Sequence, residues 1–202
     1  MEIKVITLGH IAVNCYMVST EKAALVIDPG FKSQSVLDFL IENKSKERLI
    51  LLTHAHFDHI GGALELKQKT ATDIAIGKLD NFALSDGEVN LSSRFHAHIE
   101  PFSADILLPD NKVITVGDLK IKTLFTPGHT VGGVSYLLDD VLFSGDTLFY
   151  RSVGRTDFPG GDFTVLKKSI DRIFELDSSV TVLSGHGQPT TVGEEKDYNP
   201  YI

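Results

Sequence analysis

The feature that most constrains this chain is a short segment at residues 53–62, which reads THAHFDHIGG. It places three imidazoles and one carboxylate within six positions, directly after a continuous apolar run at residues 49–52. Such a run is typical of a strand that is buried on both faces. The chain must therefore fold so that a buried strand ends at a cluster of side chains able to bind metal ions.

The spacing within this segment indicates how its side chains are divided. Residues two apart share a face of an extended chain, so His54 and His56 can point at one ion. If the chain then turns into a helix, Asp58 and His59 are carried to a neighbouring position. One segment can therefore supply ligands to two adjacent ions.

Three further candidate ligands lie far along the chain from this segment. His129, Asp146 and His186 each follow a short apolar run, and each has a glycine directly before it. Ligands collected from the ends of several strands are what an active site at the edge of a sheet requires. A lone histidine in such a turn is more often structural, but the repetition of the context favours a shared site.

Short strand-like runs and amphipathic helical runs alternate along the rest of the chain. Helices are expected after a serine cap at residue 33 or 35 and after a cap at Asp162. Residues 80–109 have no long periodic pattern and are expected to form a surface lid or insertion. No linker or repeat marks a boundary, so we expect a single domain over residues 1–202.

Composition excludes several classes of protein. The chain has 202 residues, with 19 Lys and Arg against 27 Asp and Glu, and its net charge of −8 argues against nucleic-acid or anionic-membrane binding. No apolar run approaches the roughly 20 residues of a membrane helix, and no signal peptide is visible. A single cysteine, Cys15, beside eight histidines excludes a disulfide framework and fits a cytoplasmic protein whose metal ligands are imidazoles and carboxylates.

Five segments together resemble the metallo-β-lactamase superfamily and, within it, the short glyoxalase II-like hydrolases. They are THAHFDHIGG, TPGHTVGGVSY, VLFSGDTLF, SVGRTDFPGGD and LSGHGQPTTVGEEKDYNP. The resemblance implies an α/β (α+β) fold, a four-layer αββα sandwich with a dinuclear metal centre at one edge. It assigns the ligands in three sets: His54, His56 and His129 to a first ion, Asp58, His59 and His186 to a second, and Asp146 to both.

Two more residues are candidates for a supporting role or for substrate contact. By the resemblance, Asp28 matches the acidic residue that supports the histidine-rich loop from behind, although it can equally form a turn. Arg155 is expected either to order the site or meet an anionic substrate, or else to form a structural salt bridge. The remaining histidines are expected on the surface: His10, His96 and His98.

The ligand set predicts hydrolysis of a carbonyl compound. Two divalent ions about 3.5–4 Å apart can hold a bridging hydroxide at neutral pH, so we expect Asp58 and Asp146 to act in catalysis with a metal-bound hydroxide. A thiolate leaves readily because a thiol has a pKa of only about 8.5, which favours a thioester of the hydroxyacylglutathione type. Zinc is the expected metal, and iron and manganese are alternatives.

Other activities and features stay open at this stage. The GRTDF segment also resembles iron-dependent persulfide dioxygenases, and a lactone or ester hydrolase of the same superfamily is a further alternative. Full-length glyoxalase II proteins carry a C-terminal helical extension that contacts glutathione, whereas this chain is expected to close with a polar tail from Gly193. The acyl and thiol parts of the substrate and the oligomeric state are not predicted.

Overall fold

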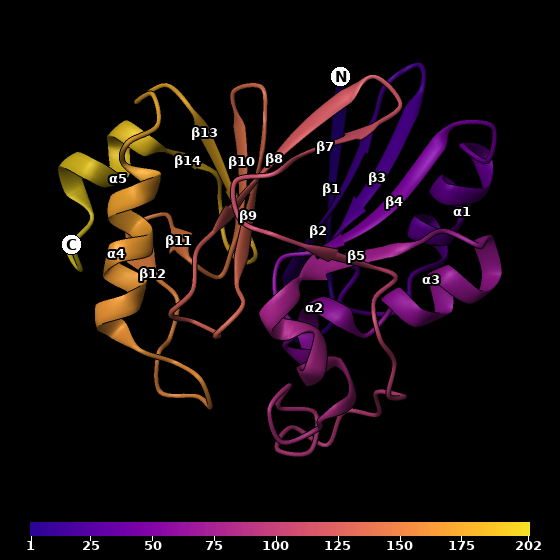
Figure 1. Ribbon diagram of the computed structural model, residues 1–202, viewed down its shortest axis with the longest axis horizontal. Coiled ribbons are helices and arrows are strands. Elements are labelled where there is room, and N and C mark those ends of the chain that lie inside the picture. Colours follow the sequence, from indigo (N-terminus) through magenta and orange to yellow (C-terminus); the bar gives the residue numbers. More distant parts are fainter.

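The computed structural model describes residues 1–202, and its centre is formed by two six-stranded sheets (Figure 1). In the first sheet β1 to β3 are antiparallel and β3 to β6 are parallel. Its strands follow chain order: β1 (Glu2–Leu8), β2 (Val13–Ser19), β3 (Ala23–Ile27), β4 (Glu47–Leu52), β5 (Ile74–Gly77) and β6 (Ile106–Leu108).

The second sheet contains the C-terminal strands. All its neighbours are antiparallel except β10 and β13, which run parallel. Across the sheet the order is β14 (Thr190–Thr191), β13 (Thr181–Ser184), β10 (Val141–Gly145), β9 (Val134–Leu138), β8 (Leu119–Phe125) and β7 (Val113–Val116). A separate two-stranded sheet is formed by β11 (Leu148–Phe149) and β12 (Ser152–Val153).

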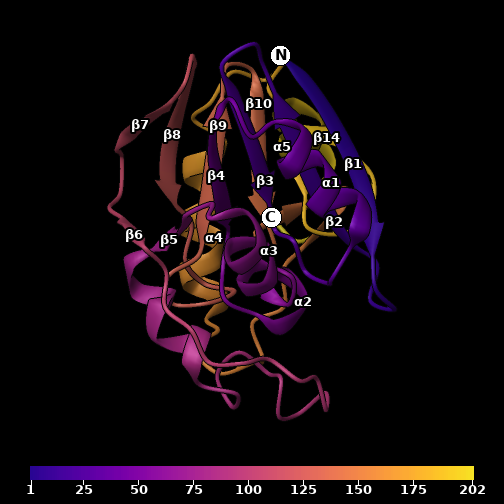
Figure 2. The same cartoon turned by 90° about the vertical axis from the view of Figure 1, so that its right-hand side faces the viewer.

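Helices cover the outer face of each sheet, as Figures 1 and 2 show from two sides. The first sheet is covered by α1 (Gln34–Glu42) and α3 (Ala63–Thr70), and the second by α4 (Phe163–Ile173) and α5 (Val192–Tyr198). The prediction of an αββα sandwich is therefore confirmed. No helix combines the length and apolar character needed to cross a bilayer.

The apolar run in β4 explains how this layering arises from the sequence. Leu49 and Leu51 pack between the sheets with Leu25 and Ile27 of β3, whereas Ile50 faces the helices α1 and α3. Because successive side chains of a strand point to opposite faces, a strand that is apolar at every position can be covered on both sides. The strand that carries the histidine-rich segment is thereby fixed from both faces.

Cap residues predicted the starts of α1 and α4 correctly, whereas α5 was missed. Ser33 precedes α1 as its N-cap residue, and the Asp162 side chain accepts a hydrogen bond from the Val165 amide at 3.0 Å. The prediction of a polar tail from Gly193 is wrong, because α5 occupies it and the Thr191 hydroxyl accepts a hydrogen bond from a first-turn amide. A threonine followed three residues later by glutamate is a capping-box signal, so the start of α5 is encoded locally.

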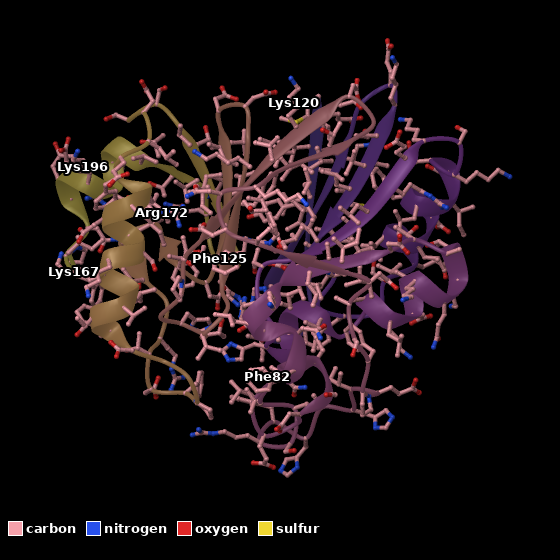
Figure 3. All side chains as sticks on the ribbon, in the orientation of Figure 1. Phe82, Lys120, Phe125, Lys167, Arg172 and Lys196 are labelled. Atoms are coloured by element: carbon pink, nitrogen blue, oxygen red, sulfur yellow. The ribbon has the colours of Figure 1, made fainter.

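The segment expected to be irregular contains short elements at its two ends. A 3₁₀ helix, Lys78–Ser85, follows β5, and β6 closes the segment at the edge of the first sheet. The role of residues 80–109 as a lid stays a prediction. Between α4 and the second sheet, Arg172 donates to the Phe125 carbonyl at 3.0 Å (Figure 3).

Candidate metal centre

The predicted ligands meet at the edge of the two sheets where α2 (Phe57–Ile60) lies. The histidine-rich segment begins where β4 ends, and α2 starts within it, so the expected change from extended chain to helix is present. The second sheet contributes from the ends of β8, β10 and β13. Ligand atoms lie within 4.8 Å of one another in three groups: His54, His56 and His129; His54, His59 and Asp146; and Asp58, His59 and His186.

Short distances connect these groups into one cluster. The Nδ1 atom of His56 lies 2.9 Å from Nε2 of His129. His129 Nε2 and His186 Nε2 each lie 3.6 Å from Asp146 Oδ2, and His59 Nε2 lies 3.4 Å from Asp146 Oδ1. Asp146 therefore contacts imidazoles from both sheets. Asp58 does so as well, because its Oδ2 lies 3.8 Å from His59 Nε2 and 3.3 Å from His186 Nε2.

Unpartnered buried atoms provide a test of whether the cluster fits metal ions. Five buried side-chain polar atoms in the chain have no hydrogen-bond partner, and four of them belong to this cluster: Nε2 of His54, His56 and His59, and Oδ1 of Asp146. A buried polar atom without a partner costs about 1–3 kcal/mol. Lone pairs that converge in this way are explained by a cation, and a nitrogen and oxygen donor set suits zinc, iron or manganese.

Burial and neighbouring charges set the protonation of these groups. Burial, together with the nearby His129, lowers the pKa of His56 to about 3, and burial also lowers the pKa of His54 well below its ordinary value. Burial alone would raise the pKa of Asp146, but the surrounding imidazoles, His59 foremost, hold it below the usual carboxyl range. Neutral His54 and His56 beside an ionised Asp146 are protonation states that bind a cation. Burial alone would lower the pKa of His59, but the charges of Asp146, Asp28 and Asp58 outweigh it and raise that pKa.

Asp28 lies behind the histidine-rich loop and accepts three hydrogen bonds there. Its Oδ1 accepts from the Thr53 amide at 2.8 Å, and its Oδ2 accepts from the Thr53 hydroxyl at 2.7 Å. The same Oδ2 lies 2.9 Å from Nδ1 of His59, which directs the Nε2 atom of that ring into the cluster. The turn at Asp28 and the support of a histidine are therefore compatible roles of one residue.

Asp80 has the same arrangement and was not identified from the sequence. Its Oδ2 accepts from the Ala55 amide at 3.1 Å and from the Thr130 hydroxyl at 2.8 Å, and its Oδ1 accepts from the Gly132 amide at 2.7 Å. Burial, partly offset by these hydrogen bonds, raises the pKa of Asp80. The residue joins the loop that carries His56 to the loop that carries His129 (two segments of different sheets). No motif surrounds it, and its only sequence signal is an aspartate soon after an apolar run.

Two tyrosines fix the ends of the strands that carry the ligands. Tyr136 of the second sheet donates to the Leu52 carbonyl at 2.6 Å, directly before the histidine-rich segment. Tyr16 of the first sheet donates to the Ser184 carbonyl, also at 2.6 Å, directly before the loop of His186. Each sheet therefore positions a ligand-bearing loop of the other.

Arg155 has a different position from the ligands. Its exposed guanidinium donates two hydrogen bonds to Asp157, at 2.9 and 2.7 Å. A structural salt bridge was one of the two roles expected for this residue. Its backbone carbonyl accepts from Nδ1 of His129 at 2.7 Å and so orients that ring. The remaining three histidines are exposed, as expected: His10, His96 and His98.

An open pocket of about 370 Å³ adjoins the cluster. Its floor includes five of the seven predicted ligands, and its walls are mostly apolar. A volume of this size accommodates a small-molecule substrate. The arrangement thus combines a potential metal centre with a pocket that opens directly onto it.

Comparisons with known proteins agree with this geometry. The family model described as the metallo-beta-lactamase superfamily matches residues 8–186. Hydroxyacylglutathione hydrolase GloC of Haemophilus influenzae is 32% identical over 100% of this chain and 98% of its own. The structure of BLEG-1 B3 metallo-beta-lactamase superposes with a TM-score of 0.91 at 39% identity, covering 99% of both chains. The structure of TTHA1623 in a di-iron-bound form superposes with a TM-score of 0.87 at 32% sequence identity. The match covers 98% of this chain and 100% of that one.

Proposed function

Because this chain belongs to the metallo-beta-lactamase superfamily, we propose that it is a metal-dependent hydrolase of thioesters of the hydroxyacylglutathione type. The observation that carries the proposal is the convergence of seven histidine and aspartate side chains with four buried, unpartnered donor atoms. The similarity to hydroxyacylglutathione hydrolase GloC supports the substrate class.

The proposed ligands divide into two sets. His54, His56 and His129 would hold one divalent ion, Asp58, His59 and His186 would hold another, and Asp146 would contribute to both. Zinc is the proposed metal because histidine and carboxylate ligands suit it, and iron is the alternative that the di-iron form of TTHA1623 supports. Two such ions, when bound, supply an activated water at neutral pH and polarise the carbonyl of the substrate.

The residues of the chain orient these groups and handle the proton. The Asp58 Oδ2 atom lies 3.3 Å from Nε2 of His186, and both residues line the open pocket, where the carboxylate can accept a proton from the attacking water. The Arg155 carbonyl and the Asp28 carboxylate hold the rings of His129 and His59. A thiolate leaving group needs little assistance from an acid.

Elemental analysis combined with a thioester hydrolysis assay tests the proposal. We expect about two metal ions per chain and hydrolysis of S-lactoylglutathione. Asp146→Ala and His129→Ala should each remove most of the activity, and His96→Ala, at an exposed histidine, should retain it. A fully metallated protein that hydrolyses no thioester, lactone or ester would overturn the proposal. Oxygen consumption with glutathione persulfide in the iron-loaded protein would support a dioxygenase instead.

Hydrolysis of β-lactams is a second candidate. It is favoured by the 39% identity to BLEG-1 B3 metallo-beta-lactamase over nearly the whole chain. The same activated water and polarised carbonyl would serve an amide in a strained ring. Comparison of kcat/KM for a cephalosporin and for S-lactoylglutathione on one metal-loaded preparation distinguishes the two candidates.

A further inference from the structure

The open pocket beside the cluster is lined by six apolar side chains, four of them aromatic: Ile11, Phe57, Leu91, Phe95, Phe149 and Phe158. Phe57 and Leu91 are buried, whereas Phe95 is 43% exposed at the wall. Apart from the ligand residues, the only charged side chain in the lining is Arg155, which Asp157 already engages. The pocket therefore offers an apolar surface to whatever is bound next to the metal centre.

The apolar side chains begin at the ligands themselves. The ring of Phe158 lies 5.8 Å from the ring of His56, edge to face, and the ring of Phe149 lies 6.3 Å from the ring of His186. Phe57 stands between His56 and Asp58 in the chain and stacks on Phe95 at 5.1 Å. A group bonded directly to the scissile carbonyl would lie against these rings, without a polar layer between.

Of the two arms of a glutathione thioester, only the acyl arm suits this surface. Glutathione carries charges and amides along its length, and placing them against apolar side chains would remove their hydration without replacement. Arg94 does not line the pocket, but its guanidinium lies 5.3 Å from the centre of the Phe158 ring and forms no ion pair. Arg155, already paired with Asp157, lies 4.3 Å from the centre of the same ring. An anionic thiol arm can meet this cation at the rim while the acyl arm fills the pocket.

We propose that this pocket selects hydroxyacyl thioesters whose acyl group carries an aromatic or branched apolar substituent. The inference rests on the proposed thioester hydrolysis and defines its substrate further. Phe95 and Phe158 are the proposed specificity-determining residues, because both line the pocket and neither is a proposed metal ligand.

Two thioesters that differ only in this substituent provide the kinetic test. S-mandeloylglutathione has a phenyl group where S-lactoylglutathione has a methyl group. We expect kcat/KM to be at least about tenfold higher for the mandeloyl compound, because the larger ring buries more apolar area. Phe95→Ala and Phe158→Ala should each reduce the ratio of mandeloyl to lactoyl kcat/KM about fivefold.

A neighbouring phenylalanine provides the matched control. Phe82 lies on the 3₁₀ helix (Figure 3) and lines a separate pocket of about 130 Å³, whose lining also includes His56. Phe82→Ala should leave the mandeloyl preference unchanged. A preference that is lost only in Phe82→Ala would overturn the assignment to the open pocket, and so would equal rates for the two substrates in the unmodified protein.

Binding of thioethers, which cannot be hydrolysed, separates this inference from the proposed reaction. Calorimetry of the metal-loaded protein compares S-(2-hydroxy-2-phenylethyl)glutathione with S-(2-hydroxypropyl)glutathione. Tighter binding of the phenyl compound, weakened by Phe95→Ala, supports the pocket assignment even if no thioester is hydrolysed. Equal binding of the two compounds together with hydrolysis of both thioesters would overturn the pocket assignment and leave thioester hydrolysis standing.

Discussion

The two sheets contribute to the candidate metal centre in different ways. The first supplies four proposed ligands from one six-residue stretch, His54 to His59, at the end of a single strand. The second supplies three, one each after β8, β10 and β13. The first group is placed by local backbone structure, whereas the second is placed by the register of a whole sheet. Changes at equivalent points of the two groups should therefore have different consequences.

Two glycines test this difference most strongly. A Cβ atom at Gly30 would lie 1.5 Å from the backbone oxygen of Asp58, and one at Gly185 would lie 2.3 Å from Oδ1 of Asp146. Gly30→Ala should lower the free energy of unfolding by about 2–3 kcal/mol, because backbone has to move. Gly185→Ala should leave stability closer to that of the unmodified protein and instead weaken metal binding, because it displaces a ligand side chain. Urea denaturation and chelator competition measure the two effects, and the reverse assignment would contradict the prediction.

The paired carboxylates Asp28 and Asp80 provide the next comparison. Each accepts three hydrogen bonds, but Asp28 supports only the histidine-rich loop, whereas Asp80 connects that loop to the second sheet. Asp28→Asn and Asp80→Asn should each reduce metal affinity about 10- to 100-fold. The asparagine amide would place an N–H donor against the N–H and O–H groups that now donate to the carboxylate.

The site affected should differ between these variants. Asp28→Asn should weaken binding of the ion that His59 is proposed to hold. Asp80→Asn should weaken binding of the ion that His56 and His129 are proposed to hold. Stepwise titration with Co²⁺, followed by visible absorption, distinguishes the two. Asp38→Asn, at an exposed aspartate, is the matched control. Identical titration curves for Asp28→Asn and Asp80→Asn would show that the two carboxylates are not specialised.

Substitution of the two tyrosines that connect the sheets should lower the free energy of unfolding by different, smaller amounts. Tyr136→Phe should lower the free energy of unfolding by about 1–1.5 kcal/mol, because it removes the hydrogen bond to the Leu52 carbonyl. Tyr16→Phe should lower the free energy of unfolding by less, because the Ser184 carbonyl keeps a second donor, the Asn14 side chain at 3.1 Å. Thermal unfolding of the metal-free variants measures both, and a larger loss for Tyr16→Phe would count against this explanation.

The smallest expected effect concerns an ion pair on the surface of the second sheet. Although partial burial would raise the pKa of Asp110, its hydrogen bonds to the Phe125 amide and Arg172 lower it. A depressed folded-state pKa adds stability above the unfolded value, and this stability is lost as the pH falls through the folded value. Asp110→Asn should therefore lower the free energy of unfolding by about 0.5 kcal/mol at pH 7. Salt should reduce this difference from the unmodified protein, and in acid the difference should vanish. Denaturation at several pH values checks this, and a constant difference would exclude the ionised carboxylate as its cause.

The fold and the clustering of the candidate ligand residues followed from the sequence because their signals are local. The run at residues 49–52 and the adjacent histidines predict a buried strand that ends at a group of possible metal ligands. Repetition of one context around His129, Asp146 and His186 extended this to the second sheet. The helix α5 was missed because its polar composition resembles a tail, although Thr191 and Glu194 give its start.

The parts that could not be predicted depend on contacts between distant segments. Asp80 acts through amides at residues 55 and 132 and a hydroxyl at residue 130, and nothing near it in sequence indicates that they will meet it. The carbonyl of Arg155, which orients His129, belongs to the backbone and has no residue-type signal. The apolar lining of the pocket is likewise assembled from segments between residues 11 and 158.

The reciprocal tyrosine contacts have a consequence for the order of folding. Neither ligand-bearing loop has its final partner until both sheets have formed and docked, because Tyr136 and Tyr16 each reach across the interface. The sequence separation of these contacts, 84 and 168 residues, makes them costly to form early. The geometry of the candidate metal centre is therefore expected to form late in folding, so that metal ions would enter a scaffold that has already assembled.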